Sequence, residues 1–449
     1  MATRFTQVVK RTGAIVPFTP ERITNAIYRA AVEVGGHDRA TAEKLTDHVI
    51  VYMEQHMPPD HIPAVEEIQD VVEKILIENR HAKVAKAYIL YRDERARARQ
   101  EKAARSAKPS GNIPWKKIWQ VLDWSVSHGV HTVDALNDRI ARGEFPDVVR
   151  ESDAAYEQDL ENAAELVKAR RDQVKIVIIA GPSSSGKTTT TIKLGMRLEH
   201  IGLKLVALNI DNYFFDLALH PKDEYGDYDF ETPQALDLEL INEHLVKLIT
   251  GEEIHLPQYD FKIGTRRPTT TPMRLAENEI ILIDSLHGLY PGMMKAIPDE
   301  RKFKLYIETL IQIKGRNGKY IRWTDLRLMR RMLRDAAHRS YNPQRTLEHW
   351  HYVRESELRH IIPYINTTDY IVNGAVSYEL PVFRPRLIEP FAQWSAQYDH
   401  DPQRQDAMIR AQRVHELLQT VTPVTREAEQ AIPATSHLRE FIGGSVYKY

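Results

Sequence analysis

The chain has 449 residues, of which 42% are hydrophobic and 27% are charged, and its formal net charge is −1. A chain of this length is expected to form two or three domains, and a charge so close to zero gives no sign of a nucleic acid or an acidic membrane surface as partner. The absence of cysteine excludes disulfides, thiolate metal sites and a cysteine nucleophile. The N-terminal stretch MATRFTQVVKRTG lacks the apolar core of a signal peptide. No apolar run approaches the ~20 residues that span a bilayer, so we expect a cytoplasmic protein without a membrane partner.

Residues 5–92 have the pattern of a small, mainly helical block. Two short extended pieces, Gln7–Arg11 and Ala14–Val16, flank a turn at Thr12-Gly13 and predict a hairpin. Apolar residues at helical spacing then predict three amphipathic helices, at Pro20–Val34, Ala40–Glu54 and Val65–Arg92.

Residues 92–114 are charged and alanine-rich, and then break at a Pro-Ser-Gly sequence, which predicts a frayed helix that runs into a linker. The arginines of this stretch would suit a nucleic acid, but acidic residues are interspersed among them, and this favours a solvated helix. Three helices are expected next, at Trp115–His128, Val133–Arg142 and Tyr156–Arg171. They carry no catalytic pattern, so we expect a packing or connecting role.

From residue 174 onward, strand-like runs alternate with helices. The predicted strands are Lys175–Ala180, Lys204–Asn209, Ile280–Ile283, Phe303–Ile307 and Tyr370–Asn373. This alternation is typical of an α/β fold in which helices cover both faces of a parallel sheet.

A complete G-x-x-x-x-G-K-[ST] pattern stands between the first of these strands and a helix predicted at Thr189–His200. Its glycines let the backbone N–H groups approach phosphate oxygens, and the positive end of the following helix faces the same anion. Lys187 would reach the β- and γ-phosphates of ATP, and the hydroxyl of Thr188 would ligate Mg²⁺. A plain Gly/Ser turn is the alternative, which the full pattern in this context disfavours. The predicted nucleotide-binding residues are Gly181, Ser183, Ser184, Ser185, Gly186, Lys187, Thr188 and Thr189.

Asp211 follows the second predicted strand, at the edge of a parallel sheet where ligands bind. A carboxylate in this position can accept the proton of an attacking hydroxyl group. Taken alone, a single aspartate at a strand end is more often a helix cap or part of a surface turn.

Several motifs occur in an order that identifies a family. GPSSSGKTT is followed by DNYF, DFETPQALDLELINEHL, GEEIHLPQYDFKIGTRR and DLRLMRRMLRDAAHRS, and the chain ends with TSHLREFIGGS. This series resembles the uridine kinase/phosphoribulokinase family of P-loop kinases, in particular its uridine kinase-like branch, over residues 175–449. The resemblance implies an ATP-dependent kinase that phosphorylates a hydroxyl group of a small molecule, with ATP and Mg²⁺ as cofactors.

The resemblance also assigns catalytic roles. Asp211 would be the general base, and Asp284 would hold Mg²⁺ together with Thr188, although the family usually has Glu-Gly where this chain has Asp284-Ser285. Lys187 and lid arginines would neutralise charge on the transferring phosphoryl group. The arginines at the matching spacing are Arg331, Arg334 and Arg339. A helix with a solvated basic face would give the same spacing.

The acceptor side departs from the family pattern. Glu231 stands where uridine-cytidine kinases have an aspartate for the sugar hydroxyls, and Tyr259 and Arg266 belong to the matching base-side motif. The histidine and arginine that would read a pyrimidine are replaced by Gly264 and Tyr341. A nucleoside acceptor therefore competes with a sugar phosphate or another polyol. A nucleotide-responsive ATP-binding protein that is not a kinase is a further alternative.

The first block resembles the ATP-cone domain, the nucleotide-sensing module of ribonucleotide reductases, over residues 5–95. The resemblance rests on VVKRTGAIVPFTPERITNAIYRAA, VEEIQDVVEKIL and AKVAKAYILYRDER. It implies a second, regulatory nucleotide bound by Lys10, Arg11 and Arg22, whereas a basic hairpin without a ligand is the alternative. Because ATP-cones often lie at subunit contacts, the resemblance also favours a homo-oligomer. The expected organisation is an ATP-cone at 5–95, a linker and helical connector at 96–172, and a kinase domain at 173–449.

Overall fold

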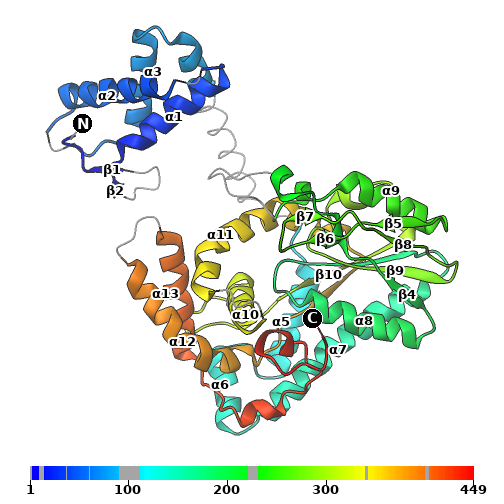
Figure 1. Ribbon diagram of the computed structural model, residues 1–449. Helices are drawn as coiled ribbons and strands as arrows, with labels where there is room; N and C mark the ends of the chain where they lie inside the picture. Colours follow the sequence, from blue (N-terminus) through cyan, green and yellow to red (C-terminus); the bar gives the residue numbers. More distant parts are fainter. Residues whose placement is uncertain are drawn as a thin grey trace. The chain divides into compact units, whose positions relative to one another are not determined.

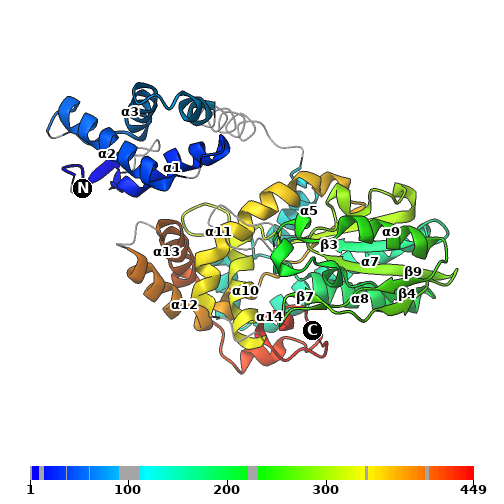
Figure 2. The same ribbon diagram turned by 45° about the horizontal axis from the view of Figure 1, so that its top comes forward.

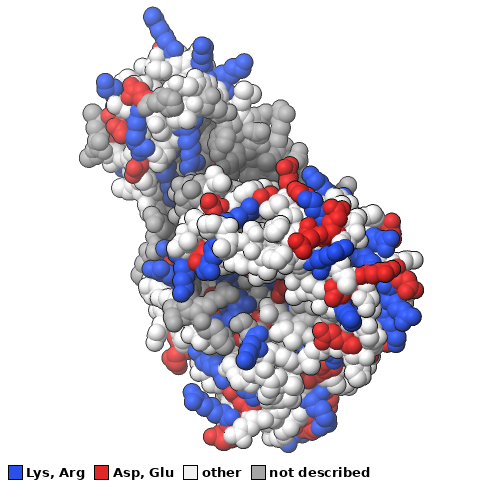
Figure 3. All heavy atoms as spheres, turned by 45° about the vertical axis from the view of Figure 1, so that its right-hand side comes forward, with Lys and Arg blue, Asp and Glu red and all other residues white. Residues whose placement is uncertain are grey.

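The computed structural model describes residues 3–9, 15–36, 38–59, 61–90, 112–220, 231–338, 342–399 and 404–448. The chain forms two compact units, residues 1–110 and 111–449, which are described separately (Figure 1). In the described residues, no helix is both long enough and apolar enough to cross a membrane. Lys and Arg side chains are interspersed with Asp and Glu over the face of the second unit that Figure 3 shows.

The first unit contains the two paired strands of the predicted hairpin, whereas its predicted turn at Thr12-Gly13 lies outside the described residues. Its strands β1 (Gln7–Val9) and β2 (Ile15–Pro17) pair antiparallel, with Val8 opposite Val16. The rest of the described unit is helical, with α1 (Pro20–Glu33), α2 (Arg39–His56), α3 (Val65–Glu78) and a helical segment at 82–90. Their apolar faces form one core, which includes Ile27, Val49 and Leu76. The amphipathic patterns therefore placed this core correctly.

The single helix that we predicted over Val65–Arg92 is wrong. The helix α3 ends at Glu78, and Asn79 turns its side-chain amide back to the carbonyl of Ile75 at 2.7 Å. Arg80 then adopts a left-handed backbone with φ of 66°. A residue in this conformation commonly terminates a helix, so the chain turns before the segment 82–90. Neither residue is glycine or proline, which is why the periodicity gave no warning.

The second unit is built around a five-stranded parallel sheet. Its spatial order is β11–β10–β3–β9–β4. The bounds of these strands are Ile176–Ala180 for β3, Lys204–Ala207 for β4, Glu279–Ser285 for β9, Lys302–Glu308 for β10 and Tyr370–Asn373 for β11. All five strands were predicted, with ends that differ by up to two residues. Short antiparallel pairs lie outside this sheet, at β5 (Ile254–Leu256) with β8 (Thr271–Met273) and β6 (Tyr259–Asp260) with β7 (Thr265–Arg266).

Helices cover both faces of the sheet (Figures 1 and 2). On one face, α7 (Phe145–Ala169) and α8 (Lys187–His200) pack against Val177 and Ile179 of β3. On the other face, α9 (Leu238–Ile249) packs against Ile176 and Ile178. A strand that is buried on both faces has no polar side, which explains the uninterrupted apolar sequence IVIIA.

A helical layer completes the second unit beside the sheet. Its members are α5 (Trp115–Ser127), α6 (Val133–Ala141), α10 (Trp323–His338), α11 (Pro343–His360), α12 (Glu379–Tyr398), α13 (Gln405–Thr420) and α14 (Arg439–Ile442). The helix α7 begins at Phe145 and not at Tyr156 as predicted, with proline in its first turn. The helices expected as a connector, α5 to α7, lie within the second unit and do not form a segment of their own.

Two buried arginines of α10 form ion pairs and also donate to backbone carbonyls of the loop at residues 181–188, which we call the P-loop. The side chain of Arg330 is fully buried and pairs with Glu379, with Nε to Oε2 at 2.7 Å and Nη2 to Oε1 at 2.6 Å. Its Nη1 donates to the carbonyl of Ser185 at 3.1 Å. One turn earlier, the buried Arg327 pairs with Glu308 and Glu357, each at 2.9 Å, and donates to the carbonyl of Ser183 at 3.0 Å.

We expect Glu379→Ala to destabilise the second unit by about 3–5 kcal/mol, because it leaves the guanidinium of Arg330 buried without its carboxylate. All six tryptophans lie between Trp115 and Trp394, so the urea dependence of tryptophan fluorescence reports on this unit alone. The control is Glu389→Ala on the exposed side of the same helix, which should change the free energy of unfolding by less than about 0.5 kcal/mol. Equal effects of the two variants would contradict this prediction.

Candidate functional site

The P-loop leaves β3 and enters α8 through two positions that favour glycine for different reasons. A Cβ on Gly181 would lie 2.3 Å from the carbonyl oxygen of Ile307. Gly186 precedes the first turn of α8 with φ of +98°, a conformation that strongly favours glycine. The loop is therefore held close to the neighbouring strand β10, with the N–H groups of the first turn of α8 at its end.

The hydroxyl groups of the loop fit a phosphate ligand. The Oγ atoms of Ser184 and Ser185 are buried, and in the described part of the chain they have no hydrogen-bond partner. Ser184 also has a positive φ of 59°. Buried hydroxyls without a partner are rare in native proteins and call for an explanation such as an absent ligand. Together with the helix N-terminus, they suit the oxygens of a triphosphate.

Lys187, Thr188 and Asp284 come together at the C-terminal ends of β3 and β9. The hydroxyl of Thr188 donates to Oδ2 of Asp284 at 3.2 Å, so the two predicted metal ligands are neighbours. Burial raises the pKa of Asp284 to about 6, which Lys187 and the hydrogen bond from Thr188 oppose. Burial also lowers the pKa of Lys187, while the charge of Asp284 counteracts that shift. One hydroxyl and one carboxylate are the oxygen donors that Mg²⁺ accepts beside phosphate oxygens.

Asp211 lies in the turn that follows β4, the strand beside β9. The strand β4 ends at Ala207, and a 3-10 helix, Ile210–Tyr213, carries the exposed side chain of Asp211. Oδ1 of Asn209 accepts from the backbone N–H of Asp211 at 2.9 Å and caps this turn. Because β4 pairs with β9, the charge of Asp211 is close enough to add to the rise in the pKa of Asp284. The two predicted acidic residues therefore share one edge of the sheet.

The predicted lid arginines lie on α10 and point to different partners. Nη1 of Arg331 donates to Oγ of Ser183 at 3.2 Å and lies 3.4 Å from Oε1 of Glu231. This places Arg331 between the P-loop and a predicted acceptor-side residue. Arg334 lies 3.5 Å from the carboxylate of Glu440. Arg339 lies outside the described residues.

The alternative of a solvated basic face is wrong for part of α10. Arg327 and Arg330 are both fully buried and bound to carboxylates. Their role is to hold the P-loop, and the sequence pattern could not distinguish them from the two arginines that face the site.

An aromatic cluster stands beside the turn that carries Asp211. The rings of Phe214 and Tyr259 are 5.6 Å apart, and those of Tyr259 and Phe261 are 4.9 Å apart. Tyr259 is buried, whereas Phe261 is 63% exposed. Burial raises the pKa of Tyr259, so its hydroxyl stays protonated at neutral pH. Gly264 closes the β6–β7 turn with φ of +69°, where a histidine side chain would be strained and would meet Leu217.

Arg266 binds the backbone directly after Asp211. Its Nε and Nη2 donate to the carbonyls of Phe214 and Tyr213, each at 2.8 Å, and its Nη1 lies 3.1 Å from Asp237. All three nitrogens therefore have partners within the protein. As a substrate contact Arg266 stays a prediction, and what the structure describes is a brace for the loop.

In the first unit, Lys10 and Arg11 lie outside the described residues. Arg22 lies in the first turn of α1 with an exposed side chain. The nucleotide site predicted for this unit stays a prediction.

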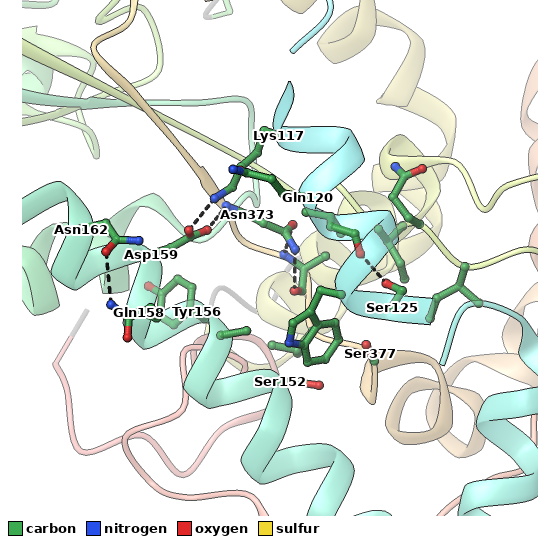
Figure 4. Close-up of a pocket in the computed structure, with 18 of the residues that line it drawn as sticks. Lys117, Gln120, Ser125, Ser152, Tyr156, Gln158, Asp159, Asn162, Asn373 and Ser377 are labelled. Carbon is green, nitrogen blue, oxygen red and sulfur yellow. Dashed lines mark hydrogen bonds and ion pairs between the residues drawn. The ribbon is translucent and has the colours of Figure 1, made fainter. Parts of the chain in front are cut away.

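A cavity of about 410 Å³ lies between α5, α7, the segment 311–313 that follows β10 and the segment 373–377 at the end of β11 (Figure 4). Lys117 and Asp159 pair with each other in its wall, and the backbone N–H of Asn373 donates to Asp159 at 3.0 Å. Because these charges cancel, the cavity suits an uncharged ligand, whereas the P-loop cations suit phosphate. Tyr156 lines the cavity, and its hydroxyl lies 2.7 Å from Oγ1 of Thr190 in the first turn of α8.

Sequence reasoning missed Glu440. The hydroxyl of Thr189, 251 residues earlier in the first turn of α8, donates to its Oε2 at 2.7 Å. The C-terminal motif TSHLREFIGGS was recognised as family-like, but a single glutamate in it has no local pattern that signals so distant a contact. Among the described residues, no three His, Asp or Glu side chains form a metal site of their own.

Two family profiles match the chain. One, described as ATP cone domain, matches residues 6–97, and the other, Phosphoribulokinase / Uridine kinase family, matches residues 176–379. A uridine kinase of Chloroflexus aurantiacus is 28% identical over 201 residues, which are 44% of this chain and 86% of that protein. A vitamin B12-dependent ribonucleoside-diphosphate reductase of Thermoplasma acidophilum is 41% identical over 107 residues, 23% of this chain and 13% of that protein.

Among solved structures, a D-glycerate 3-kinase from Cryptococcus neoformans has a TM-score of 0.26 and 14% identity, and the match covers 58% of this chain and 87% of that one. This likeness is too distant to bear on function. The two profile matches and the curated uridine kinases agree with the P-loop, the parallel sheet and the order of the motifs. The chain therefore combines an ATP-cone domain with a kinase domain of the phosphoribulokinase/uridine kinase family, and it is an ATP-dependent kinase.

Proposed function

We propose that the second unit transfers the γ-phosphoryl group of ATP to a hydroxyl group of a nucleoside. The observation that carries this proposal is the position of Arg331, which contacts Ser183 of the P-loop and Glu231 on the acceptor side. A guanidinium between a phosphate donor and an acceptor can neutralise charge on the group that moves between them.

In the proposed reaction the acceptor oxygen forms a bond to the γ-phosphorus, and the bond from this phosphorus to the β,γ-bridging oxygen breaks. ADP leaves with the bonding electrons, and Asp211 takes the hydroxyl proton. Lys187 and Arg331 bind the phosphate oxygens and orient them. Mg²⁺, held by Thr188 and Asp284, would supply further charge neutralisation.

The nucleoside is favoured by the aromatic cluster of Phe214, Tyr259 and Phe261. Exposed aromatic faces such as that of Phe261 stack on bases. The names of the curated relatives point in the same direction. The turn at Gly264 provides no imidazole, so a pyrimidine would have to be read by other groups.

The test is ADP release by the purified chain with Mg·ATP and single candidate acceptors: nucleosides, sugar phosphates and polyols. We expect a nucleoside to stimulate release and to give a product heavier by one phosphate in mass spectrometry. Stimulation by a sugar phosphate alone would replace the nucleoside proposal with that of a sugar-phosphate kinase. ATP binding without stimulation by any acceptor would contradict the proposed transfer to a nucleoside.

We expect Asp211→Asn to lower acceptor-dependent turnover roughly 10²–10⁴-fold, the range for loss of a general base, while the affinity for ATP persists. Single-turnover rates and ATP binding should both be measured. Glu243→Gln on the exposed face of α9 is the control, since it removes one carboxylate from a surface pair with Lys247. Turnover of Asp211→Asn near the wild-type value would rule out its role as base.

We also propose that the ATP-cone binds a second nucleotide, through Lys10, Arg11 and Arg22, and that this nucleotide regulates the kinase and its oligomeric state. Calorimetry with the full chain should then give two ATP per chain. Lys10→Ala and Lys187→Ala should each leave one, since each removes a phosphate-binding cation from a different site. A single ATP per wild-type chain, or two in Lys10→Ala, would contradict the second site.

A further inference from the structure

The last part of the chain reaches the P-loop from outside the segment that the kinase profile matches, which ends at residue 379. Leu438 and Phe441 are fully buried in the core of the helical layer. The ring of Phe441 lies 4.8 Å from the guanidinium carbon of Arg330. Nε2 of His437 lies 2.8 Å from the carbonyl of Gly374. The residues around Glu440 are therefore a built part of the second unit.

The carboxylate of Glu440 is bound by groups of the phosphate site. Its Oε2 accepts from the hydroxyl of Thr189 at 2.7 Å and from the backbone N–H of Thr189 at 3.3 Å. Its Oε1 lies 3.5 Å from Nη1 of Arg334. Glu440 is only 3% exposed, so these groups stabilise its charge in place of water.

Thr189 is the third residue of α8, and its N–H belongs to the first turn, which has no carbonyl partner within the helix. In a P-loop these N–H groups are the donors to nucleotide phosphates. The charge of Glu440 also acts on both other charged members of the site, since it raises the pKa of Asp284 and counteracts the lowering of the pKa of Lys187. A carboxylate thus lies where phosphate charge is expected.

Two anions cannot share these donors without a large repulsion, because their interaction in a buried site is only weakly screened. We propose that Glu440 is a built-in counter-anion of the nucleotide site, and that its carboxylate competes with a phosphate group of ATP for Thr189 and Arg334. Glu440 therefore lowers the affinity for ATP, and the phosphate that displaces it frees Arg334 to act on the transferring group. This inference rests on the proposed function only in taking ATP as the ligand of the P-loop.

The test is the affinity of the full chain for Mg·ATP, measured by calorimetry without any acceptor. Glu440→Gln keeps the shape and can still accept from Thr189, but it carries no charge. We expect it to bind ATP at the P-loop roughly 5–150-fold more tightly, the usual range for coupling between sites. In a Lys187→Ala background the gain should vanish, which would assign it to the P-loop and not to the ATP-cone.

The matched control is Glu429→Gln. This buried glutamate belongs to the same C-terminal segment, but pairs with Arg386 at 2.6 Å and contacts no P-loop residue in the described structure. It should leave the affinity for ATP unchanged. Thermal unfolding of both variants would show whether either change merely loosens the fold.

Unchanged or weaker ATP binding by a folded Glu440→Gln would overturn the proposal, and weaker binding would show instead that Glu440 positions Thr189 and Arg334 for the nucleotide. The outcome is separable from the search for an acceptor. Tighter binding without any active acceptor would keep this inference and remove the proposed transfer to a nucleoside. Acceptor-dependent turnover without tighter ATP binding by Glu440→Gln would keep the proposed function and remove this inference.

Discussion

The burial of Arg330 is the constraint on which the active end of the second unit depends. A guanidinium group stays charged inside a protein, so burying it requires carboxylates and carbonyls in a fixed geometry. Arg330 obtains them from three separate segments: Glu379 at the start of α12, Gly374 after β11 and Ser185 in the P-loop. These segments cannot shift independently while the group is satisfied. The P-loop is thus held in place by side-chain chemistry as well as by its own glycines.

This clamp divides the arginines of α10 into two kinds. Arg327 and Arg330 face inward and bind P-loop carbonyls, while Arg331 and Arg334 face the site, where Ser183, Glu231 and Glu440 are their partners. The helical repeat places all four on the same side of α10, because residues three or four apart share a face, so their different partners make the division. A helix fixed in this way presents its outer arginines in a reproducible position. Such preorganisation is what phosphoryl transfer requires of a charge-neutralising group.

The second unit is larger than its kinase profile. The helices α5 to α7 precede the matched segment and α13 and α14 follow it, yet α7 packs on α8 and the C-terminal residues complete the core around α10. Two residues of these flanking segments, Tyr156 and Glu440, form hydrogen bonds with Thr190 and Thr189 in the first turn of α8. The surroundings of the P-loop are therefore built partly from segments outside the profile match.

Local patterns were enough for most of the fold and for the phosphate end of the site. The apolar run IVIIA before a Gly-Lys-Thr loop predicted β3, the P-loop and α8, because a buried parallel strand and a phosphate-binding loop each require particular residues at adjacent positions. Asp211 was expected at the ligand-binding edge of the sheet, and the parallel pairing of β4 with β9 places Asp284 at the same edge. The break at Asn79-Arg80 was not predictable, since neither residue is glycine or proline. The early start of α7 did have a local signal, Gly143 followed by Pro146 in the first turn of α7, which the prediction did not use.

The sequence by itself determined the α/β class and the two kinds of domain, and it predicted the residues that would bind phosphate and metal. These features arise from neighbours along the chain, whose spacing fixes which side chains share a face or a loop. Only the tertiary structure decided which arginines of α10 are buried, that Arg331 lies between Ser183 and Glu231, and that Glu440 reaches Thr189. Those contacts join segments about 100 to 250 residues apart. Their partners are chosen by burial and charge compensation in the folded core, which no local pattern records.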